Sequence, residues 1–575
     1  MGTFFLKYRF GLIPFLSIWI FLACSNSTNT KTHEAAKGGR IYGGCLRTAE
    51  TDPVQTLFPA SITDATSAFI ASQIYDRLVK FNELNLKVEP ALAEKWEILD
   101  GGKKYRFFLH KDAVFHDDAC FSEGKGRKIT SQDVKYSFEI LCRNTPENQN
   151  FSSTFKGRVL GADRFFESGK GEVEGFKIID EYTFEIQLLK PNVSFLQILC
   201  QPTCAIIAKE AVEKYGISLR NGSGAFFYDS VHSDESKICL SRNSNYYGSD
   251  SLGNKLPFLD SVLVYIVDTK TEELKLFTQG KLDMITSLPS ASVKEIVETQ
   301  IKDFTGKNPK YRLDNSPEMI TQFYTFNTRK APFDNLKVRQ ALNYAIDRQK
   351  IVDDILAGQA YGPGIHGITP PTFSKEGFDY DKIIGYEYKP DLAKKLLKEA
   401  GYPDGKEFPN CKIVLNSGGA RNSDVVIEIQ KQLKENLNIE LDFYVIPSAQ
   451  KLEDSRYGKA EIIRDAWVAD YPSPESFLGL FFGKIVPEKL SDPSFPNTSR
   501  FVNEEFDQYY ELGRDASSVD SSMNYFMKAD QILMNYCPLM VLWYEGSYKL
   551  TNNKLKNSYS NAMQYRNFSE AYFVP

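Results

Sequence analysis

The stretch from residue 411 to residue 445 restricts the possible folds more than any other part of this sequence. Residues 411–415 and 439–445 are apolar runs of strand type, and residues 425–437 between them have apolar side chains at helical spacing. A strand, a helix and a second strand in this order predict a βαβ unit with parallel pairing and a right-handed crossover. The other elements alternate less strictly, so we expect a mixed α/β protein and not a single barrel.

Two segments nearer the N-terminus illustrate the two periodicities separately. Tyr105, Phe107 and Leu109 alternate with other residues, which predicts a strand over 104–109. Residues 65–81 have apolar side chains at helical spacing, which predicts one helix. A chain of 575 residues has ample core for two or three such structural domains.

The first residues have the pattern of a targeting segment. Lys7 and Arg9 form a basic start, and residues 10–21 form an apolar run that is short for a membrane span. The run leads into Phe21-Leu22-Ala23-Cys24. These four residues resemble the lipobox of a bacterial lipoprotein, with Phe21 where that pattern prefers Leu.

The lipobox resemblance implies a signal peptide over 1–23 and lipidation of Cys24. Several acyl chains on Cys24 would anchor the chain firmly in a membrane. Residues 24–37 are rich in Ser, Thr, Asn and Lys and would form a solvated tether. Plain secretion and an uncleaved anchor helix are the alternatives.

Charge and cysteine content narrow the function classes. The chain has 69 basic and 74 acidic residues, a net charge of −5, so no basic surface is expected that would neutralise nucleic-acid phosphates. Eight cysteines follow Cys24, and an even number in an exported chain is typical of disulfides. Cys200 and Cys204 are the closest candidates for a local pair; the others are Cys45, Cys120, Cys142, Cys239, Cys411 and Cys537.

Motifs for catalysis and for cofactors are missing from the sequence. It contains no Walker loop, no dinucleotide glycine motif after a strand and no His-Glu-x-x-His. His116, Asp117, Asp118 and Cys120 could form a metal site, but so short a polar cluster is more typical of a surface turn. We therefore expect a protein that is not an enzyme and that has neither a cofactor nor a metal site.

Residues 467–478 are the strongest candidate for a functional segment. An apolar run ends at Asp470, and Pro472 and Pro474 stop regular structure just beyond it. This order predicts a strand with an acidic side chain at its tip, which is where α/β proteins place ligand-binding groups. The alternative is that Asp470 only bonds the backbone of the following turn.

Several motifs along the mature chain resemble those of family 5 extracellular solute-binding proteins, the lipid-anchored or periplasmic receptors of oligopeptide and dipeptide ABC importers. The resemblance is carried by residues 90–97, 105–107, 114–117, 131–134, 242–247, 280–284, 326–348 and 467–478. It implies two α/β lobes with a hinge and a third, smaller domain. The implied division is lobe I from 38–64, 205–308 and 537–575, domain II from 65–204, and lobe II from 309–536.

The resemblance also implies roles for individual residues. Asp470 would pair with the α-ammonium group of a bound peptide, and Arg464 would contribute to holding its carboxylate. Main-chain groups of the peptide would be bound by two segments, one on each lobe: Trp467, Val468 and Ala469 with the adjoining Tyr471, and Glu50 with Thr51.

The partners implied by the resemblance are an oligopeptide, the permease subunits of an ABC importer and, through the lipid anchor, a membrane of the cell envelope. We expect a monomer outside the cytoplasm that binds no nucleic acid. Phe58 replaces an Asp usual in the family, and residues 123–128 are an insertion, so peptide length and preference stay open. A metal chelate or an oligosaccharide as ligand, and an envelope hydrolase, are the alternative functions.

Overall fold

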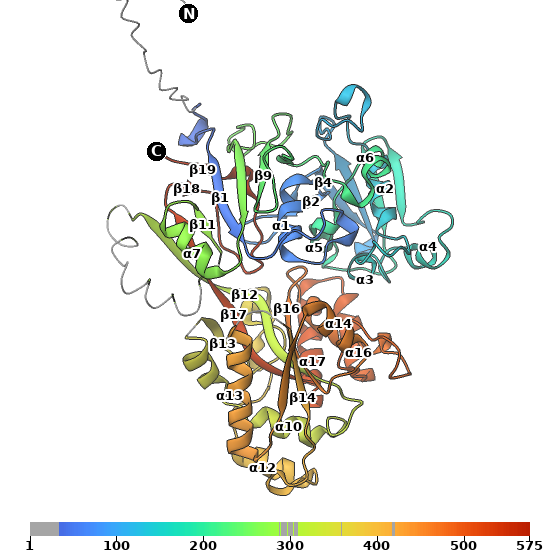
Figure 1. The fold of residues 1–575 in the computed structure, drawn as a ribbon. Coiled ribbons are helices and arrows are strands. Elements are labelled where there is room, and N and C mark those ends of the chain that lie inside the picture. Colours follow the sequence, from blue (N-terminus) through green and yellow to red (C-terminus); the bar gives the residue numbers. More distant parts are fainter. Residues whose placement is uncertain are drawn as a thin grey trace, which may run out of the picture.

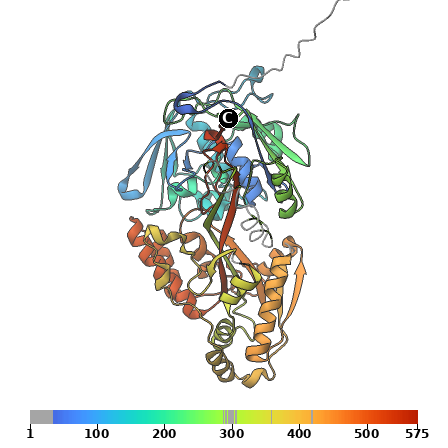
Figure 2. The same ribbon diagram turned by 90° about the vertical axis from the view of Figure 1, so that its left-hand side faces the viewer.

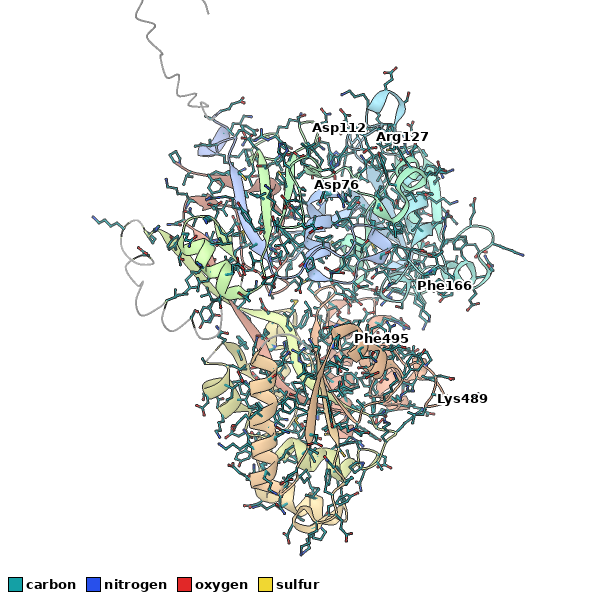
Figure 3. The ribbon with its side chains drawn as sticks, in the orientation of Figure 1. Asp76, Asp112, Arg127, Phe166, Lys489 and Phe495 are labelled. Carbon is teal, nitrogen blue, oxygen red and sulfur yellow. The ribbon has the colours of Figure 1, made fainter. Side chains whose placement is uncertain are left out.

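The computed structural model describes residues 34–286, 309–357, 359–416 and 420–575, with isolated residues between 288 and 307. The chain forms two lobes (Figures 1 and 2). The N-terminal lobe consists of residues 34–286 and 553–575, and the C-terminal lobe of residues 327–538. Side chains fill the interior of both lobes (Figure 3). The mixed α/β fold predicted from the sequence is confirmed, whereas the exact domain boundaries stay a prediction.

The N-terminal lobe contains two four-stranded sheets. The first has the order β1 (Cys45–Glu50), β10 (Ser261–Ile266), β9 (Lys237–Arg242) and β8 (Phe226–Tyr228). Strands β1 and β10 are parallel and the other pairs are antiparallel. The second sheet is antiparallel, with the order β4 (Ala93–Leu99), β5 (Lys104–Leu109), β7 (Thr183–Gln187) and β6 (Phe176–Asp180).

The prediction of one helix over 65–81 is only partly correct. Helix α1 (Ala65–Ile74) begins at its N-cap Asp64, whose side chain accepts from the N–H of Ser67, and it ends where Tyr75 becomes extended. The continuation forms strand β2 (Val79–Phe81), which pairs with β3 (Val88–Pro90). Pairing with a neighbouring strand therefore overrides the helical spacing of the apolar side chains in this segment.

The largest sheet belongs to both lobes. Its seven strands include the path β11 (Met284–Ile285), β17 (Leu539–Asn552), β12 (Tyr311–Phe326), β16 (Ile462–Val468), β14 (Lys412–Asn416) and β15 (Asp442–Ile446), with β13 (Ala360–Pro363) beside β17. Strands β14 and β15 are parallel and are connected by α13 (Ala420–Leu437), so the predicted βαβ unit is confirmed.

Strands β12 and β17 run from one lobe into the other (Figure 1). They pair antiparallel over most of their length, but the register shifts between Pro317 and Thr321. Pro317 faces Gly546 and Thr321 faces Tyr544, so three residues of β12 lie opposite one residue of β17. The ladder opens at this place, which we call the ladder opening.

Helices cover the C-terminal lobe, and their apolar faces pack on the large sheet. Buried side chains of α10 (Leu336–Tyr344), α12 (Pro390–Glu399) and α13 form one core with β14. The remaining helices and strands are α2 (Ser131–Ile140), α3 (Phe151–Thr154), α4 (Ala162–Ser168), α5 (Phe195–Leu199), α6 (Lys209–Tyr215), α7 (Lys270–Thr278), α11 (Arg348–Lys350), α14 (Ser448–Arg456), α15 (Glu475–Leu478), α16 (Glu504–Arg514), α17 (Val519–Tyr536), β18 (Leu555–Lys556) and β19 (Tyr572–Phe573).

The cysteines give a correction. All eight cysteines after Cys24 are free thiols, including Cys200 and Cys204, for which the sequence favoured a local pair. Both of these side chains are buried, and the Sγ atom of Cys204 lies 3.5 Å from the carbonyl oxygen of Ile198. Cys24 and the predicted signal peptide lie outside the described residues. No helix in the described part of the chain is long and apolar enough to cross a membrane.

Candidate ligand-binding site

Strand β16 presents the predicted functional segment at the boundary between the lobes. Its residues pair antiparallel with β12, with Val468 opposite Ile320, and the N–H of Ala469 donates to the carbonyl oxygen of Met319 at 2.9 Å. The strand ends at Val468, two residues before Asp470, and α15 begins at Glu475. A strand followed by an acidic side chain at its tip and a turn is therefore confirmed.

The second edge of β16 is only partly used. Strand β14 pairs with β16 at Ile462 and Ile463, and within the described residues no strand pairs on that side of residues 464–468. Val468 is 50% exposed, and Trp467 is half-buried. Residues 464–468 thus leave main-chain groups free along one edge, next to an accessible apolar side chain.

Asp470 is held in place by Ser476. Its N–H donates to the Oγ atom of Ser476 at 3.0 Å, and the Ser476 hydroxyl lies 3.4 Å from the carboxylate. The indole N–H of Trp467 donates to the same Oγ at 3.2 Å. Ser476 therefore fixes the tip of the strand, and the carboxylate of Asp470 contacts the hydroxyl of this side chain.

The surroundings of Asp470 are unusual for an acidic residue. It is exposed to solvent and forms no ion pair with any residue that the structure describes. Even so, loss of hydration raises the pKa of its carboxyl group to about 6, opposed by the Ser476 hydroxyl and by Arg158. These facts agree if Asp470 lies in a recess that admits water while protein surrounds it on most sides.

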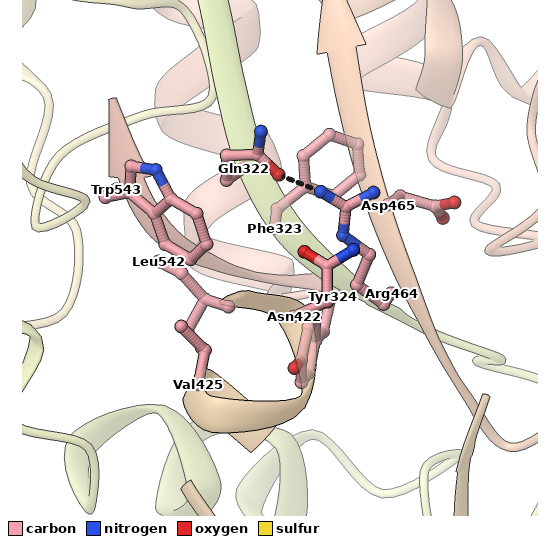
Figure 4. Close-up of a pocket in the computed structure, with 9 residues that line it drawn as sticks. All are labelled: Gln322, Phe323, Tyr324, Asn422, Val425, Arg464, Asp465, Leu542 and Trp543. Carbon is pink, nitrogen blue, oxygen red and sulfur yellow. Dashed lines mark hydrogen bonds between the residues drawn. The ribbon is translucent and has the colours of Figure 1, made fainter. Parts of the chain in front are cut away.

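Arg464 lies on β16 and faces a small pocket (Figure 4). Its guanidinium donates to the amide oxygen of Asn416 at 3.2 Å and to that of Gln322 at 2.5 Å. Burial lowers the pKa of this guanidinium. The pocket is lined by Gln322, Phe323, Tyr324, Asn422, Val425, Arg464, Asp465, Leu542 and Trp543. Arg464 forms no ion pair within the described part of the chain.

The other predicted contacts divide into two groups. Ala469 and Tyr471 are buried, so they can offer only main-chain groups to a ligand. Glu50 and Thr51 lie at the end of β1 on the N-terminal lobe. The carboxylate of Glu50 pairs with Arg566 at 2.5 Å, and its carbonyl oxygen accepts from the N–H of Val267 at 3.0 Å. These two acceptors of Glu50 are therefore already used within the lobe.

A cavity of about 210 Å³ lies at the ladder opening. Its wall combines residues from β12, β17, the start of α13 and the C-terminal segment: Leu288, Glu318, Ile320, Gln359, Arg421, Glu545, Gly546, Ser547, Tyr548 and Gln564. Gln322 connects this cavity to Arg464, because its amide N–H donates to Glu545 at 3.0 Å while its amide oxygen accepts from Arg464.

Three contacts join the two lobes beside Asp470. A guanidinium nitrogen of Arg158 lies 2.7 Å from Glu475, and both side chains are buried, 9% and 1% exposed. The hydroxyl of Ser194 lies 3.1 Å from that of Ser473. Lys190 pairs with Asp515 at 2.7 Å, nearer the surface. The turn that follows Asp470 is thus bonded directly to the opposite lobe.

The sequence missed most of these residues. Gln322, Arg421 and Glu545 come from three distant segments, and none of them lies in a motif of recognisable spacing. The predicted surface turn at His116 was also wrong for that residue, which is buried and bonds the carbonyl oxygen of Gly224 at 2.9 Å. Among the described residues no group of three or more His, Cys, Asp or Glu side chains could hold a metal ion.

Comparison with known proteins decides the family. Residues 87–486 match the model of the bacterial extracellular solute-binding proteins, family 5. The chain belongs to this family. It is therefore a solute-binding protein of a non-catalytic family, which argues against the hydrolase alternative.

This family 5 protein is similar to proteins that are named for different ligands. It is 27% identical to heme-binding protein A of Haemophilus influenzae over 89% of each chain, and 26% identical to the periplasmic oligopeptide-binding protein OppA of Escherichia coli over 79% of this chain and 78% of that one.

Solved structures agree on the fold. The structure of a periplasmic oligopeptide-binding protein (OppAIV) from Borrelia burgdorferi has a TM-score of 0.77 and 26% identity, and covers 92% of this chain and all of that one, 100%. The murein tripeptide-binding protein MppA of Escherichia coli has a TM-score of 0.76 over 92% of this chain and 98% of its own, at 22% identity.

Proposed function

We propose that this family 5 protein is the peptide receptor of an ABC importer. It would capture extended oligopeptides between its two lobes and deliver them to the permease subunits. It would act as a monomer outside the cytoplasm, held in the cell envelope by lipid on Cys24. Relatives whose printed names specify oligopeptides and dipeptides support this ligand class.

The observation that carries the proposal is the free edge of β16. This edge ends beside the carboxylate of Asp470, whose charge no ion pair among the described residues balances. An extended peptide can pair with main-chain groups of residues 464–468 whatever its sequence, because all peptides share the same backbone donors and acceptors. The α-ammonium group of the peptide would then pair with Asp470, which has no ion-pair partner among the described residues.

Arg464 supplies the matching group for the other end of the peptide. Its guanidinium is bonded to the neutral amides of Gln322 and Asn416. It lies six residues before Asp470 on the chain, so the Cα atoms of the two residues are separated by at most about 20 Å if the segment is fully extended. This distance suits an extended peptide of up to about six residues.

The test is a binding assay with three alanine-based ligands and haem. We expect isothermal titration to detect tetra-alanine with both termini free, and to show at least tenfold weaker binding when its N-terminus is acetylated or its C-terminus is amidated. Haem is the competing ligand suggested by the Haemophilus influenzae relative. Binding of haem without binding of any peptide would refute the proposal.

A variant pair assigns the ammonium site. Asp470→Asn should weaken binding of free tetra-alanine at least tenfold and leave the acetylated peptide unchanged. Asp454→Asn is the matched control, because Asp454 is an acidic residue of the same lobe that pairs with Lys459 at 2.9 Å. Equal losses in the two variants would contradict the role of Asp470.

The proposed anchor has a separate test. Cys24→Ser should move the protein from the membrane fraction to the soluble fraction of cells, because no acyl chain can then be attached. The binding of tetra-alanine should stay unchanged. Retention of the Cys24→Ser variant in the membrane would instead support an uncleaved anchor helix.

A further inference from the structure

Glu318 is a buried acidic residue that the proposed binding of peptide termini does not use. It lies on β12 at the ladder opening and is 2% exposed. Its carboxylate accepts from the amide N–H of Gln564 and from the hydroxyl of Ser547. It forms no ion pair with any described residue. A buried carboxylate without a cation is costly and therefore calls for an explanation.

Glu318 lines the cavity of about 210 Å³, and the other charges there cancel. Glu545 pairs with Arg421 at 2.6 Å and also accepts from Trp543 at 3.1 Å. The remaining polar groups in the wall are the amides of Gln359 and Gln564. With Glu318 ionised, the cavity has a net charge of −1, from two carboxylates and one guanidinium, and space for a group that carries a positive charge.

The cavity and the strand edge that the proposed function assigns to the peptide backbone are separated by β12, which pairs with the other edge of β16. Glu318, Ile320 and Gln322 alternate along β12 and therefore lie on one face of the sheet. Val468 of β16 is opposite Ile320, so its half-exposed side chain lies on that same face. A peptide that pairs with β16 would project alternate side chains toward this face.

We infer that the cavity at the ladder opening is a subsite for a cationic side chain of the ligand, an ammonium or guanidinium group as in lysine or arginine, and that Glu318 is the residue that selects it. The inference rests on the proposed function and specifies its substrate class. The cation replaces the missing partner of Glu318, while Gln359 and Gln564 supply hydrogen-bond acceptors for its remaining N–H groups.

The selection depends on pH. The titratable and charged groups around the carboxyl are Glu545, Arg421 and Tyr548 in the same wall. Loss of hydration raises the pKa of Glu318 to about 7, with Glu545 acting in the same direction and Arg421 against it. The preference for a cation should therefore be stronger at pH 8 than at pH 6, because the carboxyl is ionised at the higher pH.

The experiment is an affinity scan with tetrapeptides. Tetra-alanine is compared with peptides that carry one lysine, or one norleucine as the uncharged analogue of similar shape, at each position from the second to the fourth. At one position we expect the wild-type protein to bind the lysine peptide at least tenfold more tightly than the norleucine peptide at pH 8.

Glu318→Gln should reduce this preference to less than twofold and leave the affinity for tetra-alanine within twofold of wild type. Glu428→Gln is the control. Glu428 lies on α13 outside the cavity wall, and its buried carboxylate pairs with Lys350. It should keep the lysine preference.

The outcomes separate the two proposals. If the wild-type protein binds tetra-alanine but prefers lysine at no position, the subsite proposal is overturned and the proposal of a peptide receptor stands. A preference that persists in Glu318→Gln would overturn the role of Glu318. If none of the peptides binds, both proposals fail.

Discussion

Asp470 and Glu318 are carboxyl groups of the same lobe boundary, and loss of hydration raises the pKa of both. They differ in access, because Asp470 is exposed to solvent and Glu318 is buried. Each therefore titrates near neutral pH, and each raised pKa makes the fold less stable as the pH rises. For Asp470 the titration would also control the proposed contact with the peptide ammonium.

The affinity for tetra-alanine should fall as the pH is lowered through the pKa of Asp470, about 6. The peptide ammonium stays charged in this range, so protonation of the carboxyl alone removes the attraction. We expect the dissociation constant from isothermal titration to rise about tenfold between pH 7 and pH 5. Asp470→Asn should show no such rise, and a flat profile for the wild-type protein would contradict the assignment.

Glu318 should make the fold less stable as the pH rises. Its pKa is raised from 4.5 to about 7 in the folded protein, so the unfolded chain loses the proton first. Stability is then lost between about pH 4.5 and about pH 7 and stays low above that. Relative to wild type, Glu318→Gln should gain up to about 3 kcal/mol in free energy of unfolding between pH 4.5 and pH 8.

Urea unfolding at the two pH values measures this gain. Glu428→Gln should behave in the opposite way, because the ion pair with Lys350 lowers the pKa of Glu428 and its contribution is present at high pH. A Glu318→Gln variant whose difference from wild type does not change with pH would show that the carboxyl titrates normally.

Sequence and structure agree unevenly at the residue scale. The places of Arg464 on a strand and of Asp470 just beyond its end could be predicted, because both lie in one continuous motif, whereas their roles in binding stay predictions. Glu318, Arg421 and Glu545 could not, because only the pairing of β12 with β17 and the start of α13 brings them to one cavity. The sequence alone does not identify the neighbours of these charged residues.

At the scale of elements, a strand was predicted correctly where its pairing partner is the other strand of the same βαβ unit. The βαβ unit was confirmed because its two strands are adjacent in the sheet. The helix over 65–81 was too long, because the strand that pairs with Val79–Phe81 follows only after a turn. The spacing of the apolar residues within this segment does not show that a later strand competes with the helix for its last residues.

Helices α16 and α17 give an element-scale prediction. Gly513 of α16 packs against the buried ring of Phe526 of α17, and a Cβ atom at this position would lie 2.5 Å from the ring. Gly513→Ala should therefore lower the free energy of unfolding by about 1–3 kcal/mol, measured by urea unfolding.

The adjacent Leu512 is 40% exposed and serves as the control for this prediction. Leu512→Ala should change stability by less than about 0.5 kcal/mol, as is typical of surface substitutions. An equal or larger loss in Leu512→Ala would mean that the contact between the two helices is looser than the distance to Phe526 indicates.

At the scale of the whole molecule, the buried pair of Arg158 and Glu475 connects the lobes. Removing one member leaves the other charge buried and unpaired, which typically costs about 3–5 kcal/mol. Arg158→Met should therefore favour an open arrangement and weaken peptide binding. We expect small-angle X-ray scattering to give a larger radius of gyration for the ligand-free variant than for the ligand-free wild-type protein.

Lys190→Met is the matched control, because Lys190 also pairs across the lobes but its side chain is 64% exposed. It should change neither the radius of gyration nor the affinity by a measurable amount. Identical scattering of the wild type and Arg158→Met would show that the ion pair does not hold the lobes together.

The ladder opening has a mechanical consequence. From Tyr311 to Pro317 β12 pairs with β17 without a shift, whereas at the opening three residues face one, and the register shifts again between Gln322 and Phe323. We therefore expect the two strands to bend most easily at the opening. Glu318, Ile320, Glu545 and Gly546 lie at the ladder opening and also line the cavity. A peptide side chain bound in this wall would hinder the bending of β12 and β17. The identity of that one peptide residue would then set the lifetime of the closed, ligand-bound arrangement of the lobes.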